Sequence, residues 1–403
     1  MTSMGRRQFV QGIGAGIAAT SLPALASEYP KHYFKFHTER ASHIDFGLTP
    51  DQEQHALELH KSIFVFDGET EAGYYAGLYD NVLAGSGAGV GGSFTIGAYG
   101  IENAHGLTED IQIQRSDWWT RETLDRDVAF IQKQTQDFSG QILLCRNSTD
   151  LEKARQSGRI GMMLDVQNTV FIGNDIYVLD AYQNVGVRRV QLTYNRTVPA
   201  GTGCMEPRDG GLTVFGRDVV EHLNELQMIV DTGHSSPLTL MDAIDVSNKP
   251  ITCSHAGLRS TIPTNPRSQP DDALKKLADN GGVFGLVAFP GALVGSDHCT
   301  VADYVDQLAK AVNIMGIDHV GFAMDTVSAA SLDELLTAPE WPAEAAASVG
   351  VGIWPGSDGH KGLENQSGYP NITRGLLAAG FNDSEIAKIM GGNWLRLIED
   401  VIG

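Results

Sequence analysis

The 403-residue sequence predicts an α/β protein that forms a single (β/α)8 TIM-type barrel with long loops on its catalytic face. Eight short apolar runs rich in Val, Ile, Leu and Phe recur along the chain, as expected for parallel strands buried on both faces. Amphipathic helical stretches separate these runs, and this alternation is typical of a barrel. An open, doubly wound sheet is the alternative, but the glycine-rich dinucleotide fingerprint that it would carry after an early strand is absent from the sequence.

The predicted strands are apolar runs that end in polar residues. They span residues 62–69, 141–147, 160–168, 186–195, 228–234, 250–257, 281–289 and 318–326. The glycine-rich segment 85–92 follows no run of this kind directly, and we interpret it as a flexible loop. Two long segments, 72–120 and 327–365, follow the first and last strands, where loops usually shape access to a barrel's site.

Three helices are especially clear between the strands. Residues 216–227 place Val219, Val220, Leu223 and Leu226 on one face. Residues 270–280 begin with Pro and two acids and end before two glycines, which are good start and stop signals. Residues 300–316 follow the same rules, with Thr300 as the expected N-cap.

The N-terminal 26 residues have the features of a cleaved twin-arginine export signal. Arg6 and Arg7 precede a weakly apolar Gly/Ala-rich run that ends in a small-x-small cleavage pattern at 24–26. The run is shorter than the ~20 residues that a membrane span needs. We therefore expect a periplasmic or secreted protein exported by the twin-arginine route. Residues 27–60 would form an N-terminal extension and residues 61–403 the barrel domain.

Charge and cysteine content limit the partners and the covalent links. Twenty-nine basic and 49 acidic residues give a formal net charge of -20, which excludes nucleic acid as an expected partner because phosphates would be repelled. The four cysteines form no CxxC motif. A Cys204–Cys299 disulfide stays open as an alternative, because the expected compartment is oxidising.

Polar groups end the predicted strands, and in a barrel such residues meet on one rim. Two histidines on successive strands, together with an aspartate on the last strand, indicate a metal-binding or catalytic centre. The rim residues, in chain order, are Glu69, Glu71, Gln167, Tyr194, His234, His255 and Asp325.

Several motifs resemble the renal, or membrane, dipeptidase family of metallopeptidases (family M19), whose members have amidohydrolase-like barrels. The resemblance covers roughly residues 60–330 and a C-terminal "GGNWLRLIEDV" at 391–401. It is carried by "GLTVFGRDVV", "MIVDTGH", "KPITCSHAG", "NPRSQPDDALKKLADNGGVFGL" and "GIDHVGFAMD". It implies that His234 and His255 bind the second zinc of the family site and that Arg267 binds a substrate carboxylate. It further implies that Asp325 handles the proton of the nucleophilic water.

The remaining positions depart from the family pattern. Glu69 and Glu71 stand where the family has the His and Asp that bind the first zinc. Gln167 replaces the bridging glutamate, unless Asp165 takes that role, and Tyr194 replaces a histidine that steadies the tetrahedral intermediate. A neutral amide cannot neutralise two dications as a bridging carboxylate does, so we expect a divalent metal, zinc by resemblance, bound as one ion rather than two.

Three functions remain open at this point. The first is a metal-dependent hydrolase of dipeptides or related small amides, with His234, His255 and Gln167 as ligands and Tyr194 donating to the oxyanion. In that reading Glu69 and Glu71 act as bases or as oxygen donors to a different ion. The second is an isomerase, epimerase or lyase that uses the same carboxylates for proton transfer. The third is a catalytically inactive binding protein. The expected ligand is a small, dipeptide-like molecule with a carboxylate, and family members are often homodimers.

Overall fold

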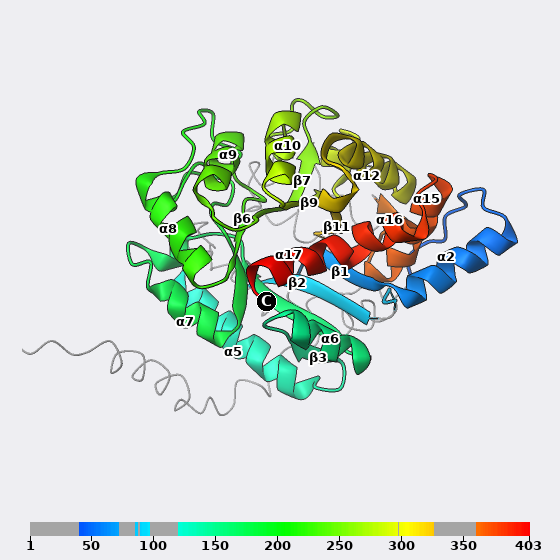
Figure 1. The fold of residues 1–403 in the computed structure, drawn as a ribbon, viewed down its shortest axis with the longest axis horizontal. Coiled ribbons are helices and arrows are strands. Elements are labelled where there is room, and N and C mark those ends of the chain that lie inside the picture. The colour runs from blue at the N-terminus through cyan, green and yellow to red at the C-terminus, as the bar shows by residue number, and fades with distance from the viewer. Residues whose placement is uncertain (1–39, 72–84, 88, 97–119, 297, 326–359) are drawn as a thin grey trace, which may run out of the picture.

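The computed structural model describes residues 40–71, 85–87, 89–96, 120–296, 298–325 and 360–403 (Figure 1). The predicted export signal lies outside these residues, as does most of the two long segments that follow the first and last strands. The side chain of Glu71 also lies outside the description, although its backbone ends the first strand.

Eight parallel strands form the predicted barrel. Each pairs with the next in the order β1, β2, β4, β5, β6, β7, β9, β11. Their bounds are β1 Phe64–Glu71, β2 Gly89–Ile96, β4 Ile160–Val166, β5 Val187–Gln191, β6 Ile229–Asp231, β7 Thr252–Leu258, β9 Val283–Val287 and β11 Val320–Ala323. The shorter strands are β3 Ile142–Leu144, β8 Ser268–Gln269, β10 Cys299–Thr300 and β12 His360–Lys361.

The barrel closes between β11 and β1 through the residues around Asp67. The Asp325 amide donates to the Glu69 carbonyl at 2.9 Å, and the Met324 amide donates to Asp67 Oδ1 at 2.8 Å. The Tyr369 hydroxyl donates to the other Asp67 oxygen at 2.7 Å. These bonds bring the ends of the first and last strands together, which a catalytic rim requires.

The prediction for the second strand was wrong. Segment 141–147 contributes only the short β3, which pairs with the start of β4 outside the eight-strand path. The second barrel strand is β2, which begins within the segment interpreted as a flexible loop. Its glycines serve close packing: a Cβ at Gly91 would lie 2.7 Å from Phe66, and one at Gly89 would lie 2.3 Å from Arg155. Glycine at such a close approach resembles a loop signal in the sequence.

Helices surround the strands (Figure 1). The three clear predictions are confirmed as α8 Val214–Glu225, α10 Asp271–Asp279 and α12 Val301–Met315, and Thr300 forms a capping box on α12. The others are α2 Pro50–Ser62, α5 Arg121–Asp137, α6 Ser148–Gln156, α7 Val178–Val185, α9 Pro237–Val246, α11 Pro290–Leu293, α15 Tyr369–Ala378, α16 Asp383–Ala387 and α17 Asn393–Val401.

The C-terminal helix α17 seals the barrel wall through Trp394. Its indole donates to the Phe322 carbonyl at 3.2 Å, and its ring lies 6.2 Å from that of Phe66. Gly68 on β1 and Gly321 on β11 leave the space for this ring, since a Cβ at either position would fall within 2.3 Å of it. The C-terminal motif that resembled the family is thus part of the barrel's packing.

Helix α2 belongs to the segment predicted as an N-terminal extension, and it packs against α15. Arg374 of α15 pairs with Glu53 at 2.5 Å, and His60 Nδ1 lies 2.8 Å from the Thr373 hydroxyl.

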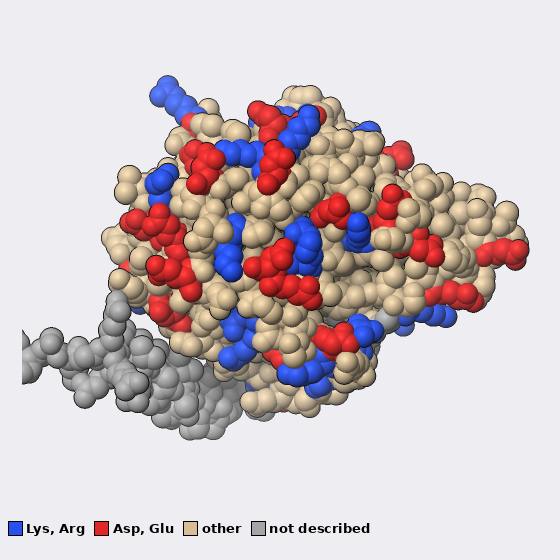
Figure 2. Space-filling view, in the orientation of Figure 1, with Lys and Arg blue, Asp and Glu red and all other residues tan. Residues whose placement is uncertain are grey.

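Acidic and basic side chains are intermixed on the face drawn in Figure 2. None of the described helices combines the length and the apolar character that crossing a membrane requires.

The four cysteines are buried and free, so the Cys204–Cys299 bridge that the sequence left open is absent. Burial raises the pKa of the Cys204 thiol to about 11, which keeps it protonated at neutral pH.

Candidate active site

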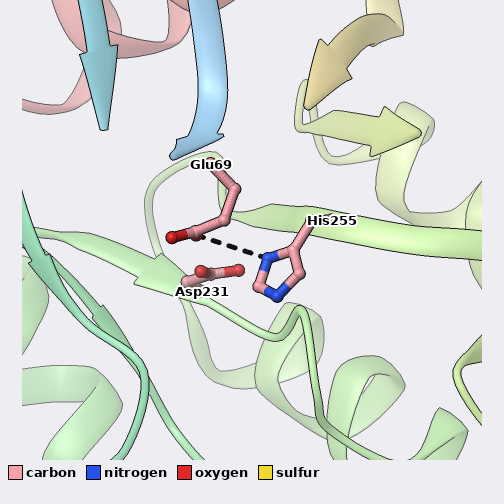
Figure 3. A group of neighbouring side chains, drawn as sticks. All are labelled: Glu69, Asp231 and His255. Carbon is pink, nitrogen blue, oxygen red and sulfur yellow. Dashed lines mark ion pairs between the residues drawn. The ribbon is translucent and has the colours of Figure 1, made fainter. Parts of the chain in front are cut away.

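Side chains from separate strands converge at the carboxyl ends of the barrel. Glu69 of β1, Asp231 of β6 and His255 of β7 each offer a ligand atom, and these three atoms lie within 4.8 Å of one another (Figure 3). His255 Nδ1 is 3.3 Å from Glu69 Oε2, the contact dashed in Figure 3. Glu69 and His255, two of the predicted rim residues, therefore face a common centre, together with Asp231, which the sequence analysis did not single out.

A hydrogen-bond chain fixes the tautomer of His255. Ser254 Oγ donates to Asp231 Oδ2 at 2.6 Å, so it is an acceptor for His255 Nδ1–H at 2.7 Å. His255 Nε2 then carries a lone pair, and this buried atom has no hydrogen-bond partner among the described residues. A buried imidazole with one nitrogen tied to a carboxylate relay and the other free has the arrangement of a metal ligand.

His234 is held in a similar way. Its Nδ1 lies 2.8 Å from Asn195 Oδ1, an acceptor, so Nε2 keeps the lone pair. Its ring lies 4.8 Å from that of His255. Burial, followed by the nearby Arg267 guanidinium, lowers the pKa of both histidines well below the usual range. Both imidazoles are therefore neutral at physiological pH, which is the form that coordinates a metal.

Asp325 faces the same histidine. Its Oδ2 is 3.8 Å from His255 Nε2, and its backbone adopts a left-handed φ of 48° directly after β11. Burial raises the pKa of this carboxyl to about 7, with Arg267 opposing and Asp67 adding to the rise. A carboxylate of that pKa in a strained backbone position is suited to accept and return a proton near neutral pH.

Arg267 lies almost fully buried behind the histidines. It donates to the His255 carbonyl at 2.9 Å and, through a shorter bond, to the Gly233 carbonyl. Both carbonyls belong to the segments that carry the two histidines, so Arg267 positions them. A guanidinium has five N–H donors, and these two bonds leave others for a ligand. Binding of a substrate carboxylate by Arg267 stays a prediction.

Tyr194 stacks on His234, with ring centroids 4.0 Å apart and the planes inclined by 26°. Burial, and then the charge of Asp325, raises the pKa of its hydroxyl far above the usual range. The phenol therefore stays protonated at neutral pH, and its O–H can donate a hydrogen bond in catalysis. The proposed oxyanion role for Tyr194 is compatible with this state.

Gln167 and Glu69 interact with each other. Gln167 Nε2 donates to Glu69 Oε1 at 3.0 Å. Burial, with the nearby Asp165 carboxylate, raises the pKa of Glu69 well above its usual range, and the Arg189 guanidinium opposes the rise. Gln167 therefore serves Glu69 as a donor, and its predicted role as a metal ligand is untested.

Sequence reasoning missed Arg189 and Asp231. Arg189 on β5 donates to Glu69 through a short bond, and it lies 3.1 Å from Asp165 Oδ2 and 3.2 Å from Asp231 Oδ2. The signal was present as two arginines inside an apolar strand, one of which must point into the barrel because side chains alternate. Asp231, the last residue of β6, precedes the histidine that drew attention to the end of that strand.

The donor set fits a metal ion on one side of the rim and not on the other. His255 Nε2 lies 3.8 Å from Asp325 Oδ2, and the neutral His234 ring lies 4.8 Å from that of His255, a set of groups that suits a divalent ion. Glu69 and Asp231 instead accept hydrogen bonds from protein groups at all four of their oxygens. Each site of a two-ion centre needs carboxylate oxygens that are open to the metal.

Comparison with known proteins gives the family. The sequence model described as "Membrane dipeptidase (Peptidase family M19)" matches residues 111–344 and 343–402, which is more than half of the chain. The chain belongs to this family. The membrane dipeptidase family was therefore recognised correctly from the motifs, and the (β/α)8 barrel is confirmed.

Two fungal relatives are called dipeptidases. Dipeptidase tcpJ of Claviceps purpurea is 28% identical over 282 residues, 68% of this chain and 59% of that protein. Dipeptidase aclJ of Aspergillus oryzae is 30% identical over 248 residues, 60% of this chain and 52% of that protein. The chain thus spans less than two thirds of the length of these relatives.

Solved structures share the fold. A Pseudomonas aeruginosa amidohydrolase is 27% identical with a TM-score of 0.73, covering 86% of this chain and 99% of its own. The probable dipeptidase PvdM of the same species is 20% identical with a TM-score of 0.70, covering 88% of this chain and 99% of its own. At that lower identity the likeness concerns the barrel alone.

Proposed function

We propose that the protein is a metal-dependent hydrolase of dipeptides or related small amides. The observation that carries the proposal is the pair of neutral, buried imidazoles beside Asp325 at the carboxyl end of the barrel. Membership of the family and the dipeptidase relatives support the same reaction class. The ion would be held by His234 and His255, and zinc is the ion that suits imidazole ligands best here.

Each step of the hydrolysis is assigned to a different residue of the site. A divalent ion, when bound, supplies Lewis acidity to the scissile carbonyl. Asp325 takes the proton of the attacking water and returns it to the leaving amine. Tyr194 donates a hydrogen bond to the developing oxyanion. Arg267 pairs with the carboxylate of the substrate, which fixes the orientation of the dipeptide.

The test is hydrolysis of a panel of L,L- and L,D-dipeptides by protein loaded with zinc or manganese. The variant His255→Ala removes a proposed ligand and sets the background. His222→Gln is the matched control, because His222 lies on helix α8 and bonds to Asp180 and Glu225, whose side chains are 45% and 74% exposed. The proposal fails if wild type, loaded with either metal, hydrolyses no dipeptide faster than His255→Ala does.

A second candidate reaction is isomerisation, epimerisation or elimination on a small peptide-derived substrate. It is favoured by two carboxyls whose pKa values are raised to about 7 by the loss of solvation, the buried Asp67 and the partly exposed Asp325. Asp67 is engaged in closing the barrel, so Asp325 is the better base. Solvent deuterium entering an uncleaved substrate would favour this reaction, whereas ligand binding without any turnover would favour an inactive binding protein.

We also propose export by the twin-arginine route, to the periplasm or beyond, on the basis of residues 1–26. Replacing Arg6 and Arg7 by lysines should retain the protein, with residues 1–26 uncleaved, in the cytoplasm. Homodimerisation, which is frequent in the family, is tested by light scattering of the mature chain.

A further inference from the structure

Arg189 is a buried cation at the centre of the rim. Its side chain is 4% exposed, and it rises from β5 between the strands that carry Asp165 and Asp231. It donates to the carboxylate of Glu69 and to the Gly68 carbonyl through short bonds, and it lies against Asp165 and Asp231 at 3.1 and 3.2 Å. Three carboxylates from three strands therefore surround one guanidinium.

Two of the three carboxylates around Arg189, those of Glu69 and Asp231, accept a hydrogen bond from a protein group at every oxygen. Glu69 accepts from Arg189 at Oε2 and from Gln167 at Oε1. Asp231 Oδ1 accepts from the amides of Gly233 and Ser254, each at 3.0 Å, and Oδ2 accepts from the Ser254 hydroxyl. A divalent ion at Glu69 would have to displace these donors and would be repelled by the guanidinium beside it.

We infer that the Arg189 guanidinium serves as the resident cation on the Glu69 side of the rim. The protein then holds a single ion, on the side of His234 and His255. The ion count rests on the proposed function; the role of Arg189 rests on its own contacts. Arg189 is a positioning residue in this scheme, because it fixes Glu69, which in turn lies 3.3 Å from His255 Nδ1.

The neighbouring Arg188 provides a matched control. It is also largely buried, but it points to the other side of the strand, where it donates to the carbonyls of Arg146 and Gln183, each at 2.7 Å. Removing either arginine deletes one buried guanidinium from the same strand. Only the removal of Arg189 takes a cation from the cluster of carboxylates.

The experiment measures bound metal and thermal stability in the full-length chain. Wild type, Arg189→Met, Arg188→Met and Glu69→Gln are dialysed against zinc, and the metal is counted by mass spectrometry. We expect one ion per chain in wild type, Arg188→Met and Glu69→Gln, and two in Arg189→Met. In chelator, Arg189→Met should melt below wild type, and zinc should raise its midpoint more than it raises that of wild type or Arg188→Met.

Two ions in wild type, or loss of the ion in Glu69→Gln, would overturn the inference. So would an Arg189→Met protein that takes up no additional ion and gains no more stability from zinc than wild type does. If Arg189→Met does not fold in chelator, refolding it with zinc is the deciding measurement: recovery supports the inference, and failure to recover refutes it. One ion without dipeptide hydrolysis rejects the proposed function alone, and two ions with hydrolysis reject the inference alone.

Discussion

Replacing Arg267 by lysine separates two roles of this side chain: holding the segments that carry His234 and His255, and binding the substrate carboxylate. The guanidinium donates to the carbonyls of Gly233 and His255 inside the barrel end. A hydrogen bond from a charged donor contributes about 1.5–3 kcal/mol, so losing both bonds costs about 3–6 kcal/mol. Lysine keeps the charge but lacks the planar guanidinium that donates to two carbonyls at once. Because one ammonium can reach only one carbonyl, we expect Arg267→Lys to lose about half of this unfolding free energy.

The assays are urea unfolding in the presence of zinc and hydrolysis of a dipeptide compared with its C-terminal amide. If Arg267 also binds the substrate carboxylate, Arg267→Lys should lower kcat/KM for the dipeptide by about tenfold or more relative to the amide. The control is Arg217→Lys, because Arg217 is exposed on α8. Equal losses on the two substrates would leave only the positioning role, and unchanged stability would refute the contacts themselves.

Three further predictions concern charge and packing. Gln167→Glu places a second carboxyl about 3 Å from Glu69, where two ionised groups would repel by about 5 kcal/mol at an effective dielectric constant of 20. Because burial already raises the pKa of Glu69, the folded variant should hold a proton between the two carboxyls and lose stability relative to wild type as the pH rises from about 6 to about 8. Urea unfolding in chelator should show this loss, and the exposed control Gln136→Glu should not. Trp394→Ala should cost about 3–5 kcal/mol of unfolding free energy, because the glycines that face the indole cannot fill the cavity. Burial lowers the pKa of His360 to about 4, so the folded state resists its protonation. Wild type should therefore lose about 3 kcal/mol relative to His360→Gln as the pH falls from 6.5 to 4, and parallel stability curves would contradict this.

Much of the barrel could be predicted because its signals are local. Buried parallel strands such as β4 and β9 read as continuous apolar runs, and helices such as α12 carry their own caps. Strand β2 could not be predicted in this way. Its glycines are required by packing against side chains distant in sequence, such as Arg155, and that requirement has no local signature.

The site was predictable to the extent that strand-end position determines it. His234, His255, Tyr194 and Asp325 do meet at one end of the barrel, as their places after the strands indicated. Arg189 was not predictable in the same way, because it lies within its strand and acts through contacts made across the barrel. Which arginine of a pair faces inward depends on strand register, and the sequence alone did not supply it.

Gln167 and Arg189, which both contact Glu69, are explained by the same charge balance at the rim. With Glu69, Asp165 and Asp231 around it, Arg189 already faces three carboxyl groups with a single positive charge. A glutamate at position 167 would add a fourth carboxyl, whereas the amide of Gln167 donates a hydrogen bond to Glu69. A bridging carboxylate at position 167 is useful only when two dications share it. An arginine at position 189 that takes the place of one dication is therefore expected to occur with a neutral residue at position 167. The histidine side is linked to this cluster: His255 bonds to Asp231 through Ser254, and its Nδ1 lies 3.3 Å from Glu69, so both carboxylates that position His255 are themselves held by Arg189.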